Sequence, residues 1–169
     1  MRTVNPTLVL ALALAAPLAA ASEPVSPDDW RNSGTPEEKL ERVVASMPST
    51  SRIMIEIGER YRTLYWAGKL GQWEFAQYQT EEMQKLVELL QTTRPNRAAS
   101  AQDFLDKAFA GYPEAIARQD WELFQKAFHA MRGECLICHG KNEHPFITLP
   151  EHPASASSPV LNLPSAGKP

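Results

Sequence analysis

The 169-residue sequence has only two cysteines, eight glycines and no excess of charge of either sign. Lys and Arg number 17 against 20 Asp and Glu, so the formal net charge is -3. Such a chain lacks the basic surface that nucleic-acid binding needs, and nucleic acid is not an expected partner. No glycine-rich phosphate loop, carboxylate pair or nucleophile with an adjacent base stands out, so we do not expect an enzyme.

The sequence also lacks an apolar run long enough to cross a membrane. The run from residue 8 to residue 21 has 14 residues, whereas a membrane-spanning helix needs about 20. Arg2 precedes this run, and three alanines end it before Ser22, which is the order of a secretory signal peptide. We therefore expect residues 1–21 to be a signal peptide and the product to be periplasmic, without an integral membrane segment. A retained N-terminal anchor is the alternative.

No window alternates apolar and polar residues with the period of two that is typical of a half-buried strand. Apolar residues instead recur at three- and four-residue spacing, which predicts amphipathic helices. The first runs from residue 49 to about residue 68, and the second ends before Pro95. The third begins after Ser100 and is interrupted at Gly111-Tyr112-Pro113. The fourth begins after Asp120, a good N-cap residue.

Short links join these four helices, and short links favour antiparallel neighbours. We therefore predict an all-α protein in which residues 49–140 form a four-helix up-down-up-down bundle. Residues 22–48 are a polar segment with one short helix that begins after Thr35 and Pro36. Residues 141–169 are a proline-rich tail, and their six prolines predict an extended or disordered segment.

The fourth predicted helix ends in the sequence ECLICHG, residues 134–140. Its CxxCH pattern is the attachment signal of c-type haem. Cysteines three residues apart on one helix face the same way, so both sulfurs can add to the two vinyl groups of one haem. His139 follows directly and can bind the iron from the proximal side. Cys135, Cys138 and His139 are therefore expected to hold one covalently attached haem c.

Three other interpretations of the cysteine pair stay open. A thioredoxin-like CxxC belongs at the start of a helix that follows a strand, where the helix dipole lowers the thiol pKa. A structural zinc site needs four ligands, and the sequence offers a single cysteine pair. A disulfide, the usual state of paired cysteines in an oxidising compartment, would close a very small loop here and stabilise little.

Met54 is the expected distal ligand of the iron. In an up-down-up-down bundle the start of the first helix lies beside the end of the fourth, near His139, and methionine is an established axial partner of a c-haem histidine. Gly58 lies one turn further along, and glycine inside a helix costs about 1 kcal/mol relative to alanine, which suggests that a porphyrin edge needs the space. Alternatively, Met54 is ordinary core and Gly58 permits close helix packing.

Four further residues are weaker candidates for contacts with a haem. Met47 precedes Pro48 and lies outside the first predicted helix, and His144 follows the motif in a segment that we expect to be solvated. Arg132 and Lys141 flank the motif and could pair with haem propionates, although exposed solvated charges are the alternative.

The position of CLICH at the end of the last of four helices resembles the class II c-type cytochromes, the cytochrome c-prime type, over residues 49–140. The segment LYWAGKLGQWEFAQYQTEEMQKLVELLQTTRP is also similar to a group of small exported cytochrome-like proteins. In class II proteins the distal side of the iron is either open or capped by a methionine from the first helix. The resemblance implies haem-binding roles for Cys135, Cys138 and His139, and for Met54 only by analogy of position.

The expected function is electron transfer by a periplasmic monohaem cytochrome, with His139 proximal, Met54 distal and a redox protein as its partner. One alternative is a five-coordinate cytochrome that binds nitric oxide or carbon monoxide. Another is a non-enzymatic haem subunit of a larger redox complex, docked through the proline-rich tail. A homodimer is compatible with the sequence.

Overall fold

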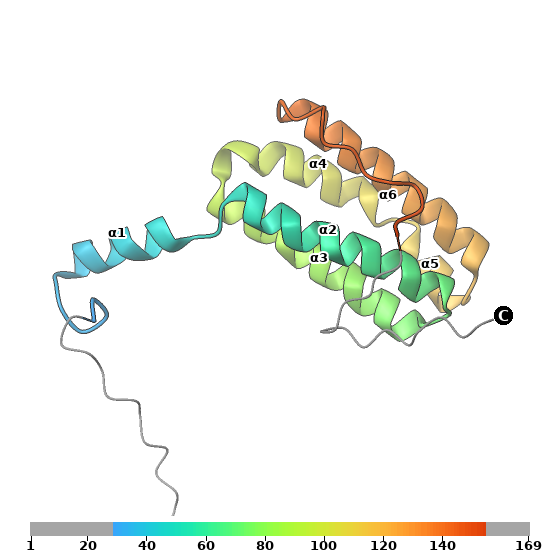
Figure 1. Ribbon diagram of the computed structural model, residues 1–169, viewed down its shortest axis with the longest axis horizontal. Coiled ribbons are helices and arrows are strands. Elements are labelled where there is room, and N and C mark those ends of the chain that lie inside the picture. The colour runs from blue at the N-terminus through green and yellow to red at the C-terminus, as the bar shows by residue number, and fades with distance from the viewer. Residues whose placement is uncertain (1–28, 155–169) are drawn as a thin grey trace, which may run out of the picture. The chain divides into compact units, whose positions relative to one another are not determined.

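The computed structural model describes residues 29–154, and all regular secondary structure in that range is helical (Figure 1). The predicted signal peptide, residues 1–21, lies outside the described residues, as does the tail beyond residue 154. The chain divides into two compact units, Met1–Ala45 and Ser46–Pro169. Between residues 29 and 154, no helix combines the length and the apolar character that crossing a bilayer requires.

The helix of the first unit, α1 (Pro36–Ser46), begins where the sequence predicts. The backbone N–H of Glu38 donates to Thr35 Oγ1 at 3.2 Å, and the Thr35 N–H donates to Glu38 Oε2 at 2.9 Å. This reciprocal pair is a capping box, which satisfies two backbone donors that the helix start leaves without partners.

The second unit contains α2 (Thr50–Lys69), α3 (Trp73–Thr93), a short 3-10 helix (Pro95–Arg97), α4 (Ala98–Ala108), α5 (Tyr112–Ala117) and α6 (Trp121–Lys141). All four predicted helical stretches are confirmed. The interruption lies at residues 109–111, which separate α4 from α5, whereas Tyr112 and Pro113 of the predicted break form the start of α5. Asp120 caps α6, because its Oδ1 accepts from the Leu123 N–H at 3.0 Å.

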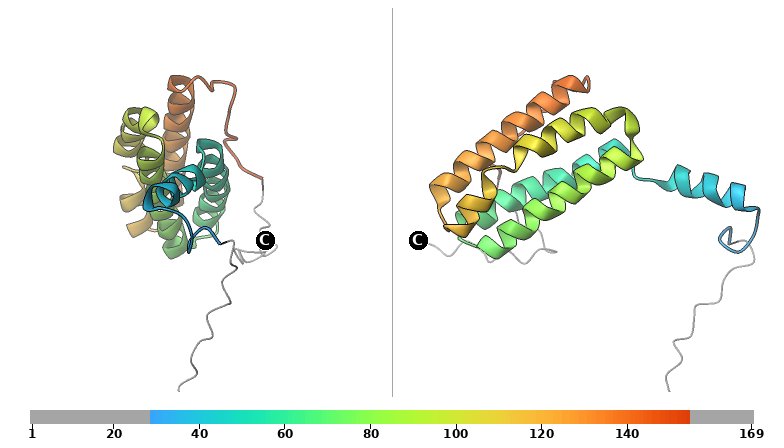
Figure 2. Two further views of the ribbon diagram at one scale, coloured as in Figure 1. Left: turned by 90° about the vertical axis from the view of Figure 1, so that its left-hand side faces the viewer. Right: turned by 180° about the vertical axis from the view of Figure 1, so that it is seen from behind.

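Within this unit α2 packs along α3 and against α6, while α4 and α5 pack on α6 and on α3 (Figures 1 and 2). Gly68 allows the close approach of α2 and α6, because a Cβ added there would overlap the ring of Phe124. The largest fully buried apolar side chains lie between these helices: Tyr112, Phe124, Phe128, Leu64, Met83 and Met131.

Residues 144–154, which we call the C-terminal strap, leave the end of α6 and run back along the bundle without helix or strand (Figure 1). Arg132 Nε donates to the Leu149 carbonyl at 2.7 Å, and Tyr61 Oη donates to the Pro150 carbonyl at 2.6 Å. Trp66 Nε1 donates to the Pro153 carbonyl at 3.1 Å. The described part of the proline-rich tail is therefore tethered to α2 and α6.

Candidate functional site

A cavity of about 600 Å³ lies between α2, α6 and the C-terminal strap, and Cys135, Cys138, His139 and Met54 all line it. Its volume falls within the range of about 300–1,000 Å³ that is usual for small-molecule and cofactor sites. A smaller cavity of about 360 Å³ shares Met54, Cys138 and His139 with it. The remaining lining of the larger cavity is mainly apolar and includes Ile57, Val87, Leu90, Ala101, Phe104 and Leu149.

The weaker candidates from the sequence lie elsewhere or are already paired. His144 lines only the smaller cavity, and Met47 lines neither. Arg132 forms an ion pair with Glu151 in addition to its hydrogen bond to the strap. Lys141 pairs with Asp103. Neither Arg132 nor Lys141 lines the larger or the smaller cavity.

The two cysteines are thiols that no disulfide joins; Cys135 is buried and Cys138 is half-buried. Burial raises the pKa of the Cys135 thiol to about 12, and it also raises the pKa of the Cys138 thiol. Reactive redox cysteines need the opposite shift, because the thiolate is the nucleophile. The electrostatics of this helix end therefore disfavour a thioredoxin-like role.

One hydrogen bond determines the tautomer of His139. Its Nδ1 lies 3.0 Å from the carbonyl oxygen of Ile147 in the strap. A carbonyl only accepts, so Nδ1 donates this hydrogen bond, and in the neutral ring the lone pair is then on Nε2. Histidines that bind a metal through Nε2 commonly have this arrangement, in which a carbonyl holds the other nitrogen and fixes the ring.

Met54 is half-buried and lines both cavities. Elsewhere in residues 29–154 the methionines are placed differently. Met83 and Met131 are fully buried in the core, and Met131 accepts a hydrogen bond from the Tyr112 hydroxyl at 3.7 Å. Met54 is thus the methionine of the described region that shares the larger cavity with His139.

Gly58 faces open space in the larger cavity. A Cβ added there would meet nothing within 4 Å outside its own helix backbone. The alternative that Gly58 permits close helix packing is therefore wrong, and Gly68 is the glycine of α2 that has this role. Gly58 and Met54 line the same cavity.

The side chains of Cys135, Cys138, His139 and Met54, which share the larger cavity, are of the types that attach and ligate a haem c. Nowhere in residues 29–154 do three or more His, Cys, Asp or Glu side chains gather as a metal site would require. A haem iron has four ring nitrogens of its own, so it needs only axial ligands from the protein. His139 and Met54 are such donors on one cavity, and two free thiols line the same cavity.

Two contributions to this site were not predicted from the sequence. The strap forms one wall through residues 147–150, and Arg62 of α2 lines the cavity near Glu59. The composition of the strap predicts an extended tail, and no local pattern shows that its carbonyls are held by side chains of α2. Arg62 has no distinguishing spacing among the charged residues of its helix.

No family model, no curated protein and no solved structure matches this chain.

Proposed function

We propose that this chain is an exported monohaem c-type cytochrome that transfers electrons in the periplasm. The observation that carries the proposal is the shared cavity: the residues of the CxxCH motif and a methionine from a distant part of the sequence line the same space of about 600 Å³. Residues 1–21 would serve as the signal peptide, and a redox protein would be the partner. We do not propose an enzymatic activity.

The proposed roles follow from the chemistry of each side chain. Cys135 and Cys138 anchor the haem through thioether bonds, and His139 offers the Nε2 lone pair as proximal ligand. The Ile147 carbonyl holds the imidazole in the required tautomer. Met54 offers its thioether as distal ligand. When bound, the haem supplies an iron that takes up and releases one electron.

The surrounding helices hold these groups and supply an apolar lining to the cavity. We propose that α2, α3, α4 with α5, and α6 form the up-down-up-down bundle of a class II cytochrome. The apolar lining of the cavity lowers the local dielectric, which is one of the means by which a protein sets the reduction potential of a haem. The strap adds a wall on the side of His139.

A second candidate function is the binding of nitric oxide or carbon monoxide at five-coordinate iron. The smaller cavity favours it, because about 360 Å³ of space adjoins Met54 and His139. In this alternative Met54 does not bind the iron, and the space beside it admits a diatomic ligand.

Absorption spectroscopy of the ferric and ferrous holoprotein distinguishes the two functions. We expect the parent and a Met131→Leu control to show a methionine-to-iron charge-transfer band in the ferric state and no uptake of carbon monoxide. Met54→Ala should lose the band and bind carbon monoxide. High-spin ferric iron in the parent, with ready uptake of carbon monoxide, would contradict electron transfer and support gas binding.

A further inference from the structure

We infer that Arg62 binds a carboxylate group of the tetrapyrrole at the side of the cavity that α2 forms. This inference depends on the proposed function, since haem carries two propionates. The cofactor would then have a polar contact with Arg62 of α2 in addition to its covalent bonds to α6.

The inference starts from a buried donor without a partner. In residues 29–154, two side-chain nitrogen or oxygen atoms are buried and make no hydrogen bond, Arg62 Nε and Gln79 Nε2. Arg62 lines the larger cavity and Gln79 does not. A buried N–H without an acceptor is unfavourable, and a missing ligand is one physical reason for such a donor.

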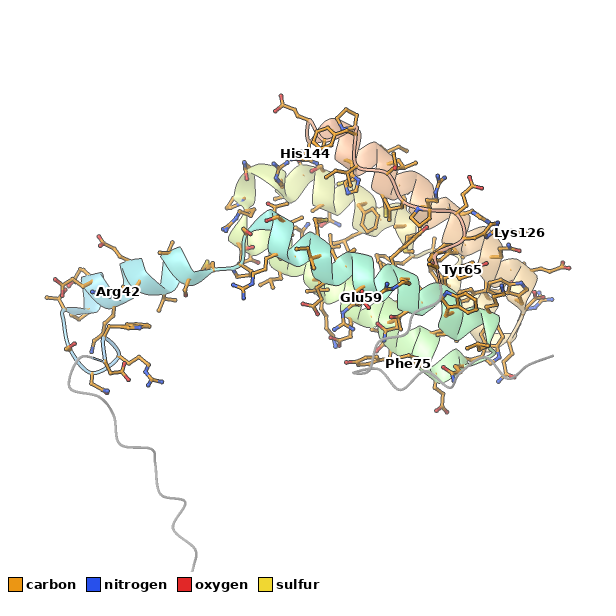
Figure 3. The ribbon with its side chains drawn as sticks, viewed as in Figure 1. Arg42, Glu59, Tyr65, Phe75, Lys126 and His144 are labelled. Carbon is orange, nitrogen blue, oxygen red and sulfur yellow. The ribbon has the colours of Figure 1, made fainter. Side chains whose placement is uncertain are left out.

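The existing partner of Arg62 occupies only part of its guanidinium. Both carboxylate oxygens of Glu59 contact Nη2 of Arg62. A guanidinium has five N–H donors in a planar fork, and its edges match the two oxygens of a carboxylate. Glu59 thus leaves the Nε–H of Arg62 without an acceptor among the described residues, and this donor is available to a second carboxylate. Figure 3 labels Glu59 on α2, the helix that carries Arg62.

The position of Arg62 agrees with the orientation that the cysteines would impose. In haem, the propionates stand on the edge opposite the vinyl groups, and the vinyl groups are the ones that Cys135 and Cys138 would bind. Both cysteines are on α6, whereas Arg62 lines the cavity from α2. The propionate edge would therefore point away from α6.

The other cations near the site are less suitable. Arg97 lines the smaller cavity together with Cys138, and its charge acts on that thiol, so it belongs to the vinyl edge. It also donates to Asn142 Oδ1 at 2.6 Å. Arg132 and Lys141 have protein partners outside the cavity. Arg62 is the arginine that combines a place in the larger cavity with an unused donor.

The test measures how the reduction potential of the holoprotein depends on pH. It compares three proteins: the parent, Arg62→Gln and the control Arg52→Gln. Arg52 is an exposed arginine of the same helix that lines neither cavity. In the parent and in Arg52→Gln, the arginine keeps the pKa of the propionate below the usual value of about 4 for a carboxyl group. In Arg62→Gln the propionate loses its cation beside Glu59, so its pKa rises. The potential should then fall as pH rises through that value, because the new negative charge favours ferric iron.

The double variant Glu59→Gln/Arg62→Gln identifies the titrating group. If the propionate titrates, the pH-dependent fall persists without Glu59. If the pH-dependent fall in potential disappears in the double variant, Glu59 is the titrating group and the inference is wrong. A pH profile of Arg62→Gln equal to that of Arg52→Gln would also overturn the inference, although the haem stays attached and the proposed function is untouched.

Arg62→Lys covers the case in which Arg62→Gln does not mature. Lysine keeps the charge but has no planar fork and no Nε–H, so the fall in potential should begin at higher pH than in the parent. A profile like that of the parent would contradict the role of Nε. Failure of the parent itself to acquire haem would instead overturn the proposed function.

Discussion

The buried thiols of Cys135 and Cys138 show how the environment of single residues limits what the site can do. Burial favours the neutral thiol over the thiolate, and the pKa of Cys135 rises from 9.0 to about 12. An unmodified thiol of this kind is a poor nucleophile and a poor metal ligand at neutral pH. A thiol that is converted to a thioether has no ionisable group. The unfavourable ionisation of a buried thiol therefore no longer matters once the haem is attached covalently.

The raised pKa predicts slow alkylation of Cys135 in the haem-free chain. Below pH 9, its thiolate fraction should be about a thousandfold smaller than in the unfolded chain, given a shift from 9.0 to about 12. Mass spectrometry after treatment with iodoacetamide, in buffer and in urea, measures the two rates. The rate in buffer should rise about tenfold per pH unit up to about pH 12. Equal rates in buffer and in urea at pH 8 would contradict the burial of this thiol.

The raised pKa of Cys135 also makes the stability of the haem-free folded chain depend on pH. The unfolded chain releases the thiol proton near pH 9 and the folded chain only near pH 12. The contribution of the buried thiol is therefore complete below pH 9 and is lost as pH rises towards 12.

The motif residues were predictable from the sequence because their chemistry requires a fixed local spacing. CxxCH identifies Cys135, Cys138 and His139 without any knowledge of the fold, and helical periodicity adds Met54 on a predicted helix. The tautomer of His139 was not predictable, since Ile147 approaches it only after the chain turns back beyond α6. The place of Arg62 was not predictable either, because an unpaired Nε arises from packing and not from the spacing of residues along the chain.

In helix α2, replacing Gly58 or Gly68 by alanine should change the free energy of unfolding of the haem-free chain in opposite directions. Gly58→Ala should raise the free energy of unfolding by up to about 1 kcal/mol, because alanine favours a helix and the added Cβ meets no neighbour. Gly68→Ala should lower it by about 1–3 kcal/mol, because the added Cβ overlaps the ring of Phe124. Urea unfolding measures both. Similar effects at the two positions would show that the space at Gly58 does not exist.

The C-terminal strap depends on side chains of α2, and Tyr61 makes one of its shortest hydrogen bonds. Figure 3 labels Tyr65 further along the same helix, where its hydroxyl lies 3.2 Å from His152 Nδ1 of the strap. Tyr61→Phe removes only the bond to the Pro150 carbonyl and should lower the free energy of unfolding by about 0.5–1.5 kcal/mol.

The matched control for this variant is Tyr78→Phe on α3, where the tyrosine is exposed. It should leave stability within about 0.5 kcal/mol of the parent, as is usual for surface substitutions. Thermal unfolding of the three proteins measures the difference. A Tyr61→Phe variant as stable as the control would mean that the strap is not held at this point.

The helix boundaries followed from local signals, whereas the strap did not. Ser49 and Asp120 both accept a backbone hydrogen bond at the start of their helices, as N-cap residues do. Prolines 150 and 153 belong to the proline-rich composition from which an extended or disordered segment was predicted. Their carbonyls still accept bonds from Tyr61 and Trp66, and such long-range pairs leave no pattern in neighbouring residues.

For the whole molecule, the candidate site is a product of tertiary structure. The sequence predicts an all-α protein, which is confirmed for residues 29–154. The larger cavity, however, needs α2, α6 and the strap together, and residues of α3 and α4 also line it. Each segment supplies a different kind of group: thiols and an imidazole from α6, a thioether and a guanidinium from α2, and a backbone carbonyl from the strap.

The most direct test of the account is the intact mass of the protein after expression in a host that assembles c-type cytochromes. We predict a product that lacks residues 1–21, carries the mass of one haem and has no thiol that reacts with iodoacetamide after denaturation. A Cys135→Ala/Cys138→Ala control should carry no covalent haem. A parent protein recovered as bare polypeptide, with both thiols reactive, would contradict the central claim.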